Sequence, residues 1–234
     1  ARRADVVQRP RHHRPRQQPR QVGQRLPRVP RRHLQHRLER GRLQAACRDV
    51  GVAEPNREQA AYVIGLSLAG AMAAIAPTLD PASQARLAER YRYHYLARDH
   101  ELTLFDGAHA LLQDLRAQGY LLAVATGKAR NGLNRVLSAS GLGGLFDATR
   151  CADESFSKPH PAMLLELMEE LDVAPTRAIM IGDTTHDLLM ARNAGVASLA
   201  MSYGAHAVDE LETESPRAIL HSVAELREWL SQNA

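Results

Sequence analysis

The stretch AIMIGDTTHD, residues 178–187, decides how this chain is expected to fold. Four apolar residues and a glycine precede polar residues that open a helical pattern, THDLLMARNAG, over residues 185–195. A short, wholly apolar run before a helix is typical of a parallel strand that is covered on both faces. The polar residues then stand at the carboxyl end of that strand, where open α/β sheets bind their ligands.

The same alternation of short apolar strand and helix extends through the second half of the chain. The expected strands are YLLAVAT (120–126), AIMIG (178–182), VASLAM (196–201) and the weaker RAIL (217–220). The expected helices between and around them are GAHALLQDLRAQG (107–119), ARNGLNRVLSASG (129–141), HPAMLLELMEELDV (160–173), THDLLMARNAG (185–195) and SVAELREWLSQ (222–232). This order predicts the α/β class with a doubly wound parallel sheet.

Three polar clusters follow strands or precede helices in this half: TGK (126–128), SKP (157–159) and GDTTHD (182–187). The carboxyl ends of parallel strands meet at one edge of a sheet, so clusters that are distant in sequence can converge there. We therefore expect one ligand site built from all three.

The first two clusters are suited to bind a phosphoryl group. The hydroxyl of Thr126, with the backbone N–H groups of Gly127 and Lys128 at a helix N-terminus, can bind anionic oxygens. The ammonium of Lys158 can neutralise a transferring phosphoryl group. The chain has 28 arginines but only two lysines, Lys128 and Lys158, and both lie in these clusters. The alternatives are that Thr126 only caps the next helix and that Lys158 is solvated.

The third cluster is suited to bind a metal ion. The carboxylates of Asp183 and Asp187 can hold Mg²⁺, which in proteins takes one or two carboxylates together with phosphate oxygens and water. The alternative for Asp187 is structural, because Thr184 and Asp187 have the spacing of a capping box.

Residues 43–100 show a different, helical pattern. Alanine-rich and leucine-rich segments with proline or glycine between them predict a compact helical bundle. Tyr91 and Tyr95 are four residues apart, which favours packing within the bundle over stacking on nucleic-acid bases.

Residues 1–42 match neither pattern. Prolines interrupt every possible element, and no apolar run is longer than two residues, so we expect this segment to be irregular or disordered. It carries a net charge of +12, against −8 for residues 43–234. Clustered arginine can bind nucleic-acid phosphates, although we consider a nucleic-acid partner unlikely.

The remaining composition excludes several classes of protein. Cys47 and Cys151 are far apart and have no partners at metal-ligand spacing, so neither a disulfide framework nor a zinc site is expected. No apolar run approaches the roughly 20 residues of a membrane span, and the first residues lack the apolar region of a secretory signal. We expect a cytoplasmic protein without a membrane partner.

The order VATGK, SKPHP, IGDTTHD, preceded by a helical insert and LFDG, resembles the haloacid dehalogenase-like superfamily. In particular it resembles the phosphoglycolate phosphatase-like branch, whose members have a helical cap. The resemblance implies that Thr126 is the phosphate-binding residue of the second motif and Lys158 the lysine of the third. It also implies that Asp183 and Asp187 are the metal-binding acids of the fourth motif.

The resemblance also implies a domain plan and a function. Residues 43–102 would form the cap that closes over the site, and residues 103–234 the Rossmann-like core. The implied activity is Mg²⁺-dependent hydrolysis of a small phosphomonoester, with 2-phosphoglycolate the first candidate, through an aspartyl-phosphate. The alternatives are a non-catalytic protein that binds a phosphorylated ligand or a partner, and a nucleic-acid binder that uses the basic segment.

One part of the family pattern is missing. The first motif is an apolar strand followed by D-x-D-G-T, in which the first aspartate is the nucleophile, and this sequence contains no D-x-D. The family spacing would place that motif near residues 25–29, which read RLPRV. We therefore expect the chain as written to be inactive and two strands of the sheet to lack a partner. Our hypothesis is that residues 1–42 are an out-of-frame translation of a GC-rich coding sequence.

Overall fold

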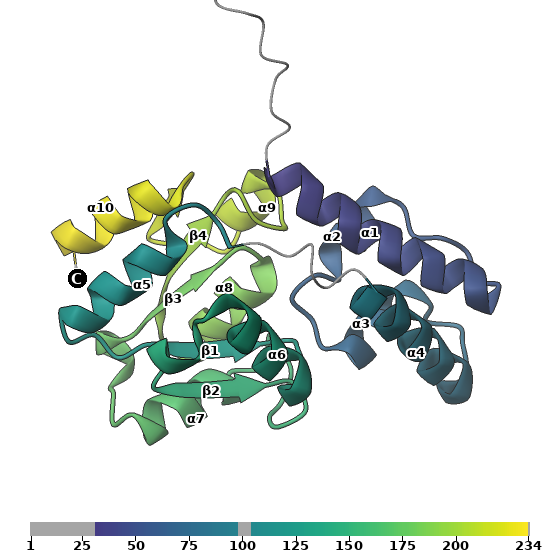
Figure 1. Cartoon of the computed structure of the whole chain (residues 1–234), viewed down its shortest axis with the longest axis horizontal. Helices are drawn as coiled ribbons and strands as arrows, with labels where there is room; N and C mark the ends of the chain where they lie inside the picture. Colours follow the sequence, from purple (N-terminus) through teal and green to yellow (C-terminus); the bar gives the residue numbers. More distant parts are fainter. Residues whose placement is uncertain (1–30, 98–103, 234) are drawn as a thin grey trace, which may run out of the picture.

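The computed structural model describes residues 31–97 and 104–233, which form a group of four helices and a larger α/β part (Figure 1). The four helices are α1 (Arg31–Val50), α2 (Arg57–Tyr62), α3 (Leu68–Ile75) and α4 (Pro81–Ala97). We call these four helices the cap.

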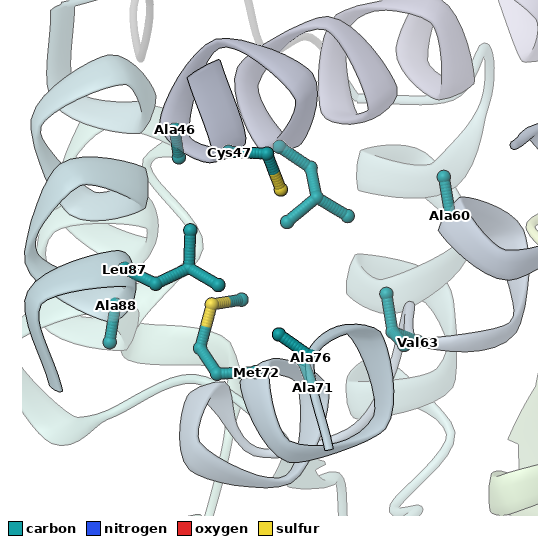
Figure 2. Packing of buried hydrophobic residues seen from close by; sticks show 10 residues of the cluster. Ala46, Cys47, Ala60, Val63, Ala71, Met72, Ala76, Leu87 and Ala88 are labelled. Atoms are coloured by element: carbon teal, nitrogen blue, oxygen red, sulfur yellow. The ribbon is translucent and has the colours of Figure 1, made fainter. Parts of the chain in front are cut away.

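The cap has a hydrophobic core of its own. Side chains from all four helices point toward one another in Figure 2, and Leu87, Met72 and Cys47 are almost fully buried there. Much of the remaining core is alanine, which lets the helices approach closely. The predicted helical bundle is therefore present, with its long helices α1 and α4 side by side (Figure 1).

The predicted boundary between an irregular segment and the cap at residues 42 and 43 needs correction. Helix α1 runs through it, and Leu38, Arg42 and Leu43 are all buried. The hydroxyl of Tyr91 in α4 donates a hydrogen bond of 2.9 Å to Glu39. The reason is that Pro30 is the last of the clustered prolines, so the sequence after it can form a helix that packs on α4. The part of the predicted irregular segment before residue 31 lies outside the described residues.

The α/β part alternates helices with strands. Its helices are α5 (Ala108–Ala117), α6 (Arg130–Ser140), α7 (Ala162–Glu170), α8 (Thr185–Asn193), α9 (Val208–Glu212) and α10 (Val223–Asn233), with short 3₁₀ helices η2 (Gly143–Leu145) and η3 (Pro175–Arg177). Its strands are β1 (Ala123–Thr126), β2 (Ala148–Cys151), β3 (Ile179–Gly182), β4 (Ala197–Met201) and β5 (Ala218–Leu220). Every strand pair in this part is parallel.

Helices cover both faces of the sheet, as expected for a doubly wound fold. Side chains of a strand alternate between its faces. In β4, Leu199 and Met201 pack in one cluster with residues of α5 and α10. Ala200, between them, packs on the opposite side against Leu188 of α8 and Leu211 of α9. The predicted α/β class and layering are confirmed.

The sheet is divided into two pieces. Strand β1 pairs only with β2, and β3 pairs with β4, which pairs with β5; among the described residues no strand joins β1 to β3. Ala125 of β1 and Met180 of β3 pack against the same cluster of α7 and α8 side chains, so the two pieces share one helical layer. Ile181 of β3 is 37% exposed, which is unusual for a strand in the middle of such a sheet. This break is the one expected from the missing first-motif strand.

Two strand predictions were inaccurate. Strand β2 was not predicted because its sequence, ATRC, contains no apolar run; its Arg150 forms ion pairs with Glu166 and Glu170. Strand β1 begins three residues later than predicted, and Leu121 before it is 52% exposed.

Two predicted absences can be compared with the structure directly. Both cysteines, Cys47 and Cys151, are buried and form no disulfide. None of the helices in the described ranges is long and apolar enough to cross a membrane.

Candidate functional site

A pocket of about 920 Å³ lies between the cap and the carboxyl ends of β1 and β3. Every residue that the sequence singled out for phosphate or metal binding lines this pocket: Thr126, Gly127, Lys128, Lys158, Asp183 and Asp187. The predicted convergence of three distant clusters is therefore present in the fold, although their roles remain predictions.

Lys158 forms a buried ion pair with Asp187. The Nζ atom lies 2.6 Å from Oδ1 of Asp187, and each side chain is only 6% exposed. The alternative that Lys158 is merely solvated is therefore wrong. A buried ion pair of this kind fixes the position of the ammonium, because either partner alone would be an uncompensated buried charge.

Asp187 also caps helix α8. The backbone N–H and the hydroxyl of Thr184 both donate to Oδ2 of Asp187, and the N–H of Asp187 donates back to the Thr184 hydroxyl. Burial alone would raise the pKa of Asp187, but the charge of Lys158 and these hydrogen bonds lower it below its ordinary value. The structural reading of Asp187 as a capping-box residue is confirmed, and the same carboxylate faces the pocket.

Asp183 has no cation in direct contact among the described residues. Its Oδ2 accepts a hydrogen bond of 2.9 Å from the backbone N–H of Ala205. Burial, and secondly the charge of Asp187, raise the pKa of Asp183 to about 6. A Cβ at Gly204 would lie 2.0 Å from that of Asp183, so only glycine allows this approach. The loop of residues 202–206 after β4 was not predicted as part of the site. A glycine at position 204, just after a buried strand, could have indicated that the backbone approaches another residue closely there.

Thr126 and Gly127 form a tight turn after β1. The Thr126 hydroxyl accepts a hydrogen bond of 3.2 Å from the N–H of Lys128. Thr126 is not the N-cap of α6, since that position is Ala129, so the alternative reading of Thr126 as a cap is wrong. The N–H of Arg130 in the first turn of α6 is bonded instead by the carboxylate of Asp153.

A loop of the cap covers this turn. A Cβ at Gly127 would lie 2.3 Å from the carbonyl oxygen of Leu66 and 2.6 Å from that of Gly65. Gly65 also lies against Thr184, and the imidazole of His186 contacts the carbonyl oxygen of Tyr62 at 2.7 Å. The cap residues near Gly65 therefore lie directly over the candidate site.

Helix α4 supplies pocket residues whose contribution was not predicted. The Nζ of Lys128 donates a hydrogen bond of 2.8 Å to the hydroxyl of Tyr95. Arg92 lines the same pocket. Tyr91 packs against the hydrophobic core of the cap, as expected, whereas the hydroxyl of Tyr95 contacts Lys128 of the α/β part. The contact between Tyr95 and Lys128 could not be predicted from the sequence. The spacing of the two tyrosines indicates only that they lie on one face of a helix, not which part of the chain packs against that face.

The acidic residues match a magnesium site only in part. No group of three or more histidine, cysteine, aspartate or glutamate side chains is assembled for a metal anywhere in residues 31–97 or 104–233. Asp187 is held by Lys158, which leaves Asp183 as the carboxylate able to accept a cation. Mg²⁺ often binds through one or two carboxylates plus phosphate oxygens and water, so the donor set fits a site that is completed by a phosphorylated ligand.

Comparison with curated proteins gives relatives that are phosphatases by name. Over 188 residues, 77% of this chain and 81% of the relative, the chain is 35% identical to Probable phosphatase IndB of Dickeya dadantii. Over 155 residues, 65% of this chain and 72% of the relative, it is 30% identical to Pyrophosphatase PpaX of Bacillus anthracis.

Solved structures with the same fold include a hydrolase from Pseudomonas syringae, with a TM-score of 0.78 and 20% identity over 85% of this chain and 93% of that chain. Another is a predicted phosphatase from Clostridium acetobutylicum, with a TM-score of 0.74 and 24% identity over 84% of this chain and 92% of that chain. A sequence model described as haloacid dehalogenase-like hydrolase matches residues 41–201. With this match and the shared fold, the chain belongs to the haloacid dehalogenase-like hydrolase family.

Proposed function

We propose that the pocket binds the phosphoryl group of a small cytoplasmic phosphomonoester, with 2-phosphoglycolate the first candidate. The activity that belongs to this site is Mg²⁺-dependent hydrolysis. The observation that carries the proposal is the presence of all six predicted residues, from three separate loops, in the walls of one pocket. A pyrophosphatase and a phosphatase among the relatives support phosphoryl transfer as the reaction class.

The residues present have distinct roles in this proposal. The hydroxyl of Thr126 and the N–H of Gly127 bind phosphoryl oxygens, and the ammonium of Lys158 offsets their charge. Asp183 would hold Mg²⁺ together with a phosphoryl oxygen and water. When bound, the metal ion supplies further positive charge to the phosphoryl group. The cap loop at Gly65 and Leu66 excludes water from the turn beneath it.

The chain as written lacks the nucleophilic aspartate of the family's first motif. Four other carboxylates line the pocket, and each accepts a hydrogen bond within the structure. Glu39 accepts from Tyr91, and Asp153 accepts from the N–H of Arg130. Asp183 accepts from Ala205, and Asp187 is paired with Lys158. With no D-x-D in the sequence, we propose that this chain binds phosphorylated ligands without turning them over.

The test separates binding from turnover. We expect no hydrolysis of para-nitrophenyl phosphate with Mg²⁺ by the chain as written, whereas orthophosphate binds in calorimetry and binds more tightly with Mg²⁺. Asp183→Asn should remove the effect of Mg²⁺ and leave weaker, metal-independent binding. Robust hydrolysis by this chain would contradict the account of the missing nucleophile, and no phosphate binding would contradict the proposed function itself.

In the first candidate the phosphatase activity belongs to the protein as encoded in its intact reading frame. The second candidate is that binding a phosphorylated ligand or a partner is the whole role of the protein, with no phosphatase in another frame. The observation that favours it is a pocket that retains every predicted phosphate-binding residue in a chain that has no D-x-D nucleophile. The nucleotide sequence upstream of the Leu43 codon distinguishes the two candidates. A strand followed by D-x-D-G-T in another frame would support the phosphatase and our hypothesis of an out-of-frame segment. Its absence would favour the binding role.

A further inference from the structure

Three aromatic rings join the cap to the α/β part outside the pocket. Tyr62, the last residue of α2, packs edge-on against His186 of α8, with ring centres 5.0 Å apart, and is stacked with His206 at 6.4 Å. The two imidazoles pack edge-on against each other at 5.2 Å. We call these three residues the ring cluster. All three lie in the described part of the chain, and none of them lines the pocket.

The ring cluster is anchored in the core and reaches out to the cap. The two histidines, His186 and His206, are almost fully buried, whereas Tyr62 is half exposed. The Nε2 atom of His186 lies 2.7 Å from the backbone carbonyl oxygen of Tyr62, to which it donates a hydrogen bond. That carbonyl is at the C-terminal end of α2, where helix carbonyls lack partners within the helix. The core therefore holds both the ring of Tyr62 and its backbone.

The imidazole of His206 also holds the loop of residues 202–206 against α8. Its Nδ1 atom accepts a hydrogen bond of 3.0 Å from the backbone N–H of Thr185 and lies 3.1 Å from the hydroxyl of Thr185. One edge of the ring thus contacts the first turn of α8, while its face is stacked with Tyr62 of the cap. A single side chain joins the loop, the helix and the cap.

The backbone of the same loop holds Asp183. The N–H of His206 donates a hydrogen bond of 3.1 Å to the carbonyl oxygen of Asp183, and the N–H of Ala205 donates to its Oδ2. Gly204 lies against the Cβ of this aspartate. Three consecutive residues therefore contact the carboxylate that would hold Mg²⁺, and one of them carries the side chain that is stacked with Tyr62.

We propose that Tyr62 and His206 are positioning residues for Asp183: the stacking of their rings holds the loop of residues 202–206, and this loop holds the carboxylate in place for the metal ion. The position of the cap on the core thereby sets how well the metal site is ordered. The part of this inference that concerns the metal ion rests on the proposed function, whereas the link between Tyr62 and the loop does not.

The first test needs neither metal nor ligand. Amide hydrogen exchange of the full chain is compared for Tyr62→Ala, which removes the ring, and Tyr62→Phe, which keeps it and is the matched control. We expect Tyr62→Ala to speed exchange in residues 202–206 at least about threefold, within the range that one aromatic contact supplies. Exchange in α7, which packs on β1 and β2, should not change. Tyr62→Phe should leave both segments as they are.

A second variant tests whether the effect of Tyr62 passes through His206. His206→Asn removes the ring but keeps an oxygen that can accept from the N–H of Thr185. It should speed exchange in residues 202–206 by at least as much as Tyr62→Ala. The double variant should exchange no faster than His206→Asn alone, because both changes remove the same stacked pair.

The third measurement is the effect of Mg²⁺ on the binding of orthophosphate, by calorimetry on the full chain. Tyr62→Ala should reduce the gain in affinity from Mg²⁺ about threefold to tenfold. It should change the metal-free affinity less than twofold, because the proposed phosphate ligands Thr126 and Lys158 lie on other loops. A general loss of stability would not separate these two affinities. Tyr62→Phe should bind as the unaltered chain does.

The outcomes separate this inference from the proposed function. Unchanged exchange in residues 202–206 of Tyr62→Ala, or additive effects in the double variant, would overturn the link between the cap and the loop, whether or not phosphate binds. Faster exchange with an unchanged effect of Mg²⁺ would overturn the positioning of Asp183. Failure of the unaltered chain to bind orthophosphate would overturn the proposed function and the metal part of the inference, and the exchange measurements would still decide the link.

Discussion

At the scale of single residues, the two aspartates of the GDTTHD cluster differ in how their charges are balanced. The carboxylate of Asp187 accepts hydrogen bonds from the Lys158 ammonium and from two donors of Thr184. The carboxylate of Asp183 accepts one from the backbone N–H of Ala205 and is repelled by the charge of Asp187. Two carboxylates four residues apart in sequence therefore have pKa values shifted in opposite directions. The consequences for stability can be measured separately.

For Asp183 we predict that Asp183→Asn stabilises the metal-free chain. Its pKa of about 6 in the folded chain lies above the ordinary value of 3.8, so folding favours the neutral form. The resulting cost to stability begins as pH rises above 3.8 and is complete above about pH 6. The variant should gain up to about 3 kcal/mol at pH 7.5 and little at pH 4. Urea unfolding in EDTA at both pH values measures this, and an equal gain at both would contradict it.

For the buried ion pair we predict that Lys158→Met destabilises the chain by about 3 to 5 kcal/mol at pH 7, because Asp187 is left buried without its cation. The double variant Lys158→Met, Asp187→Asn should recover most of that loss, since an amide still accepts the hydrogen bonds of Thr184. Denaturant unfolding of the single and double variants measures the coupling. Additive losses would show that the two residues act independently.

At the scale of elements, the division of the sheet sets the local stability of the strands. β4 is paired on both sides and Leu199 and Ala200 are fully buried, whereas β1 is paired on one side only. Backbone groups without a strand partner are free to exchange with solvent unless other contacts protect them. Because the sheet is divided between β1 and β3, the backbone N–H groups of β1 are less protected by strand pairing than those of β4.

We predict that amide hydrogen exchange is markedly faster in residues 123–126 of β1 than in residues 197–201 of β4. Mass spectrometry of peptides spanning each strand measures this directly. β2 serves as the internal comparison, because it too is paired on one side only. Equal protection of β1 and β4 would show that the unpaired edge of β1 is covered by something other than the described strands.

At the scale of the whole molecule, the cap and the core meet where the loop at Gly65 and Leu66 covers Gly127. The contact is so close that no side chain fits at residue 127. One of the close contacts between the cap and the core therefore requires a glycine that is part of the predicted phosphate-binding turn.

We predict that Gly127→Ala destabilises the chain by about 1 to 3 kcal/mol, because the added Cβ would push the cap loop away from the core. Gly132→Ala is the matched control. In the first turns of α6 its Cβ would meet nothing closer than 3.8 Å, so it should be neutral or stabilise by up to about 1 kcal/mol. Thermal unfolding of both variants tests the contrast. Similar effects at the two positions would show that the cap loop does not lie against Gly127.

The sequence by itself determined the class of fold and named six of the residues that line the candidate site. Apolar runs such as AIMI and VASLAM, set between helical patterns, predicted parallel strands between two layers of helices. Polar clusters at the ends of such strands are expected to share one edge of the sheet. The class of fold follows from the periodicity and order of residues, which need no knowledge of contacts. The break between β1 and β3 was predicted from the resemblance to the family, whose first-motif strand is missing from this sequence.

Only the tertiary structure decided which charges compensate one another. The choice of Asp187 as the partner of Lys158, the neutral partner of Lys128 in Tyr95, and the approach of Gly204 to Asp183 all join residues that are far apart in sequence or lie on different elements. It also decided that α1 begins before residue 43, because the burial of Leu38 and the hydrogen bond from Tyr91 to Glu39 are tertiary contacts that the sequence pattern does not show. Electrostatic balance depends on distances of a few ångströms, and those distances exist only once the chain has folded.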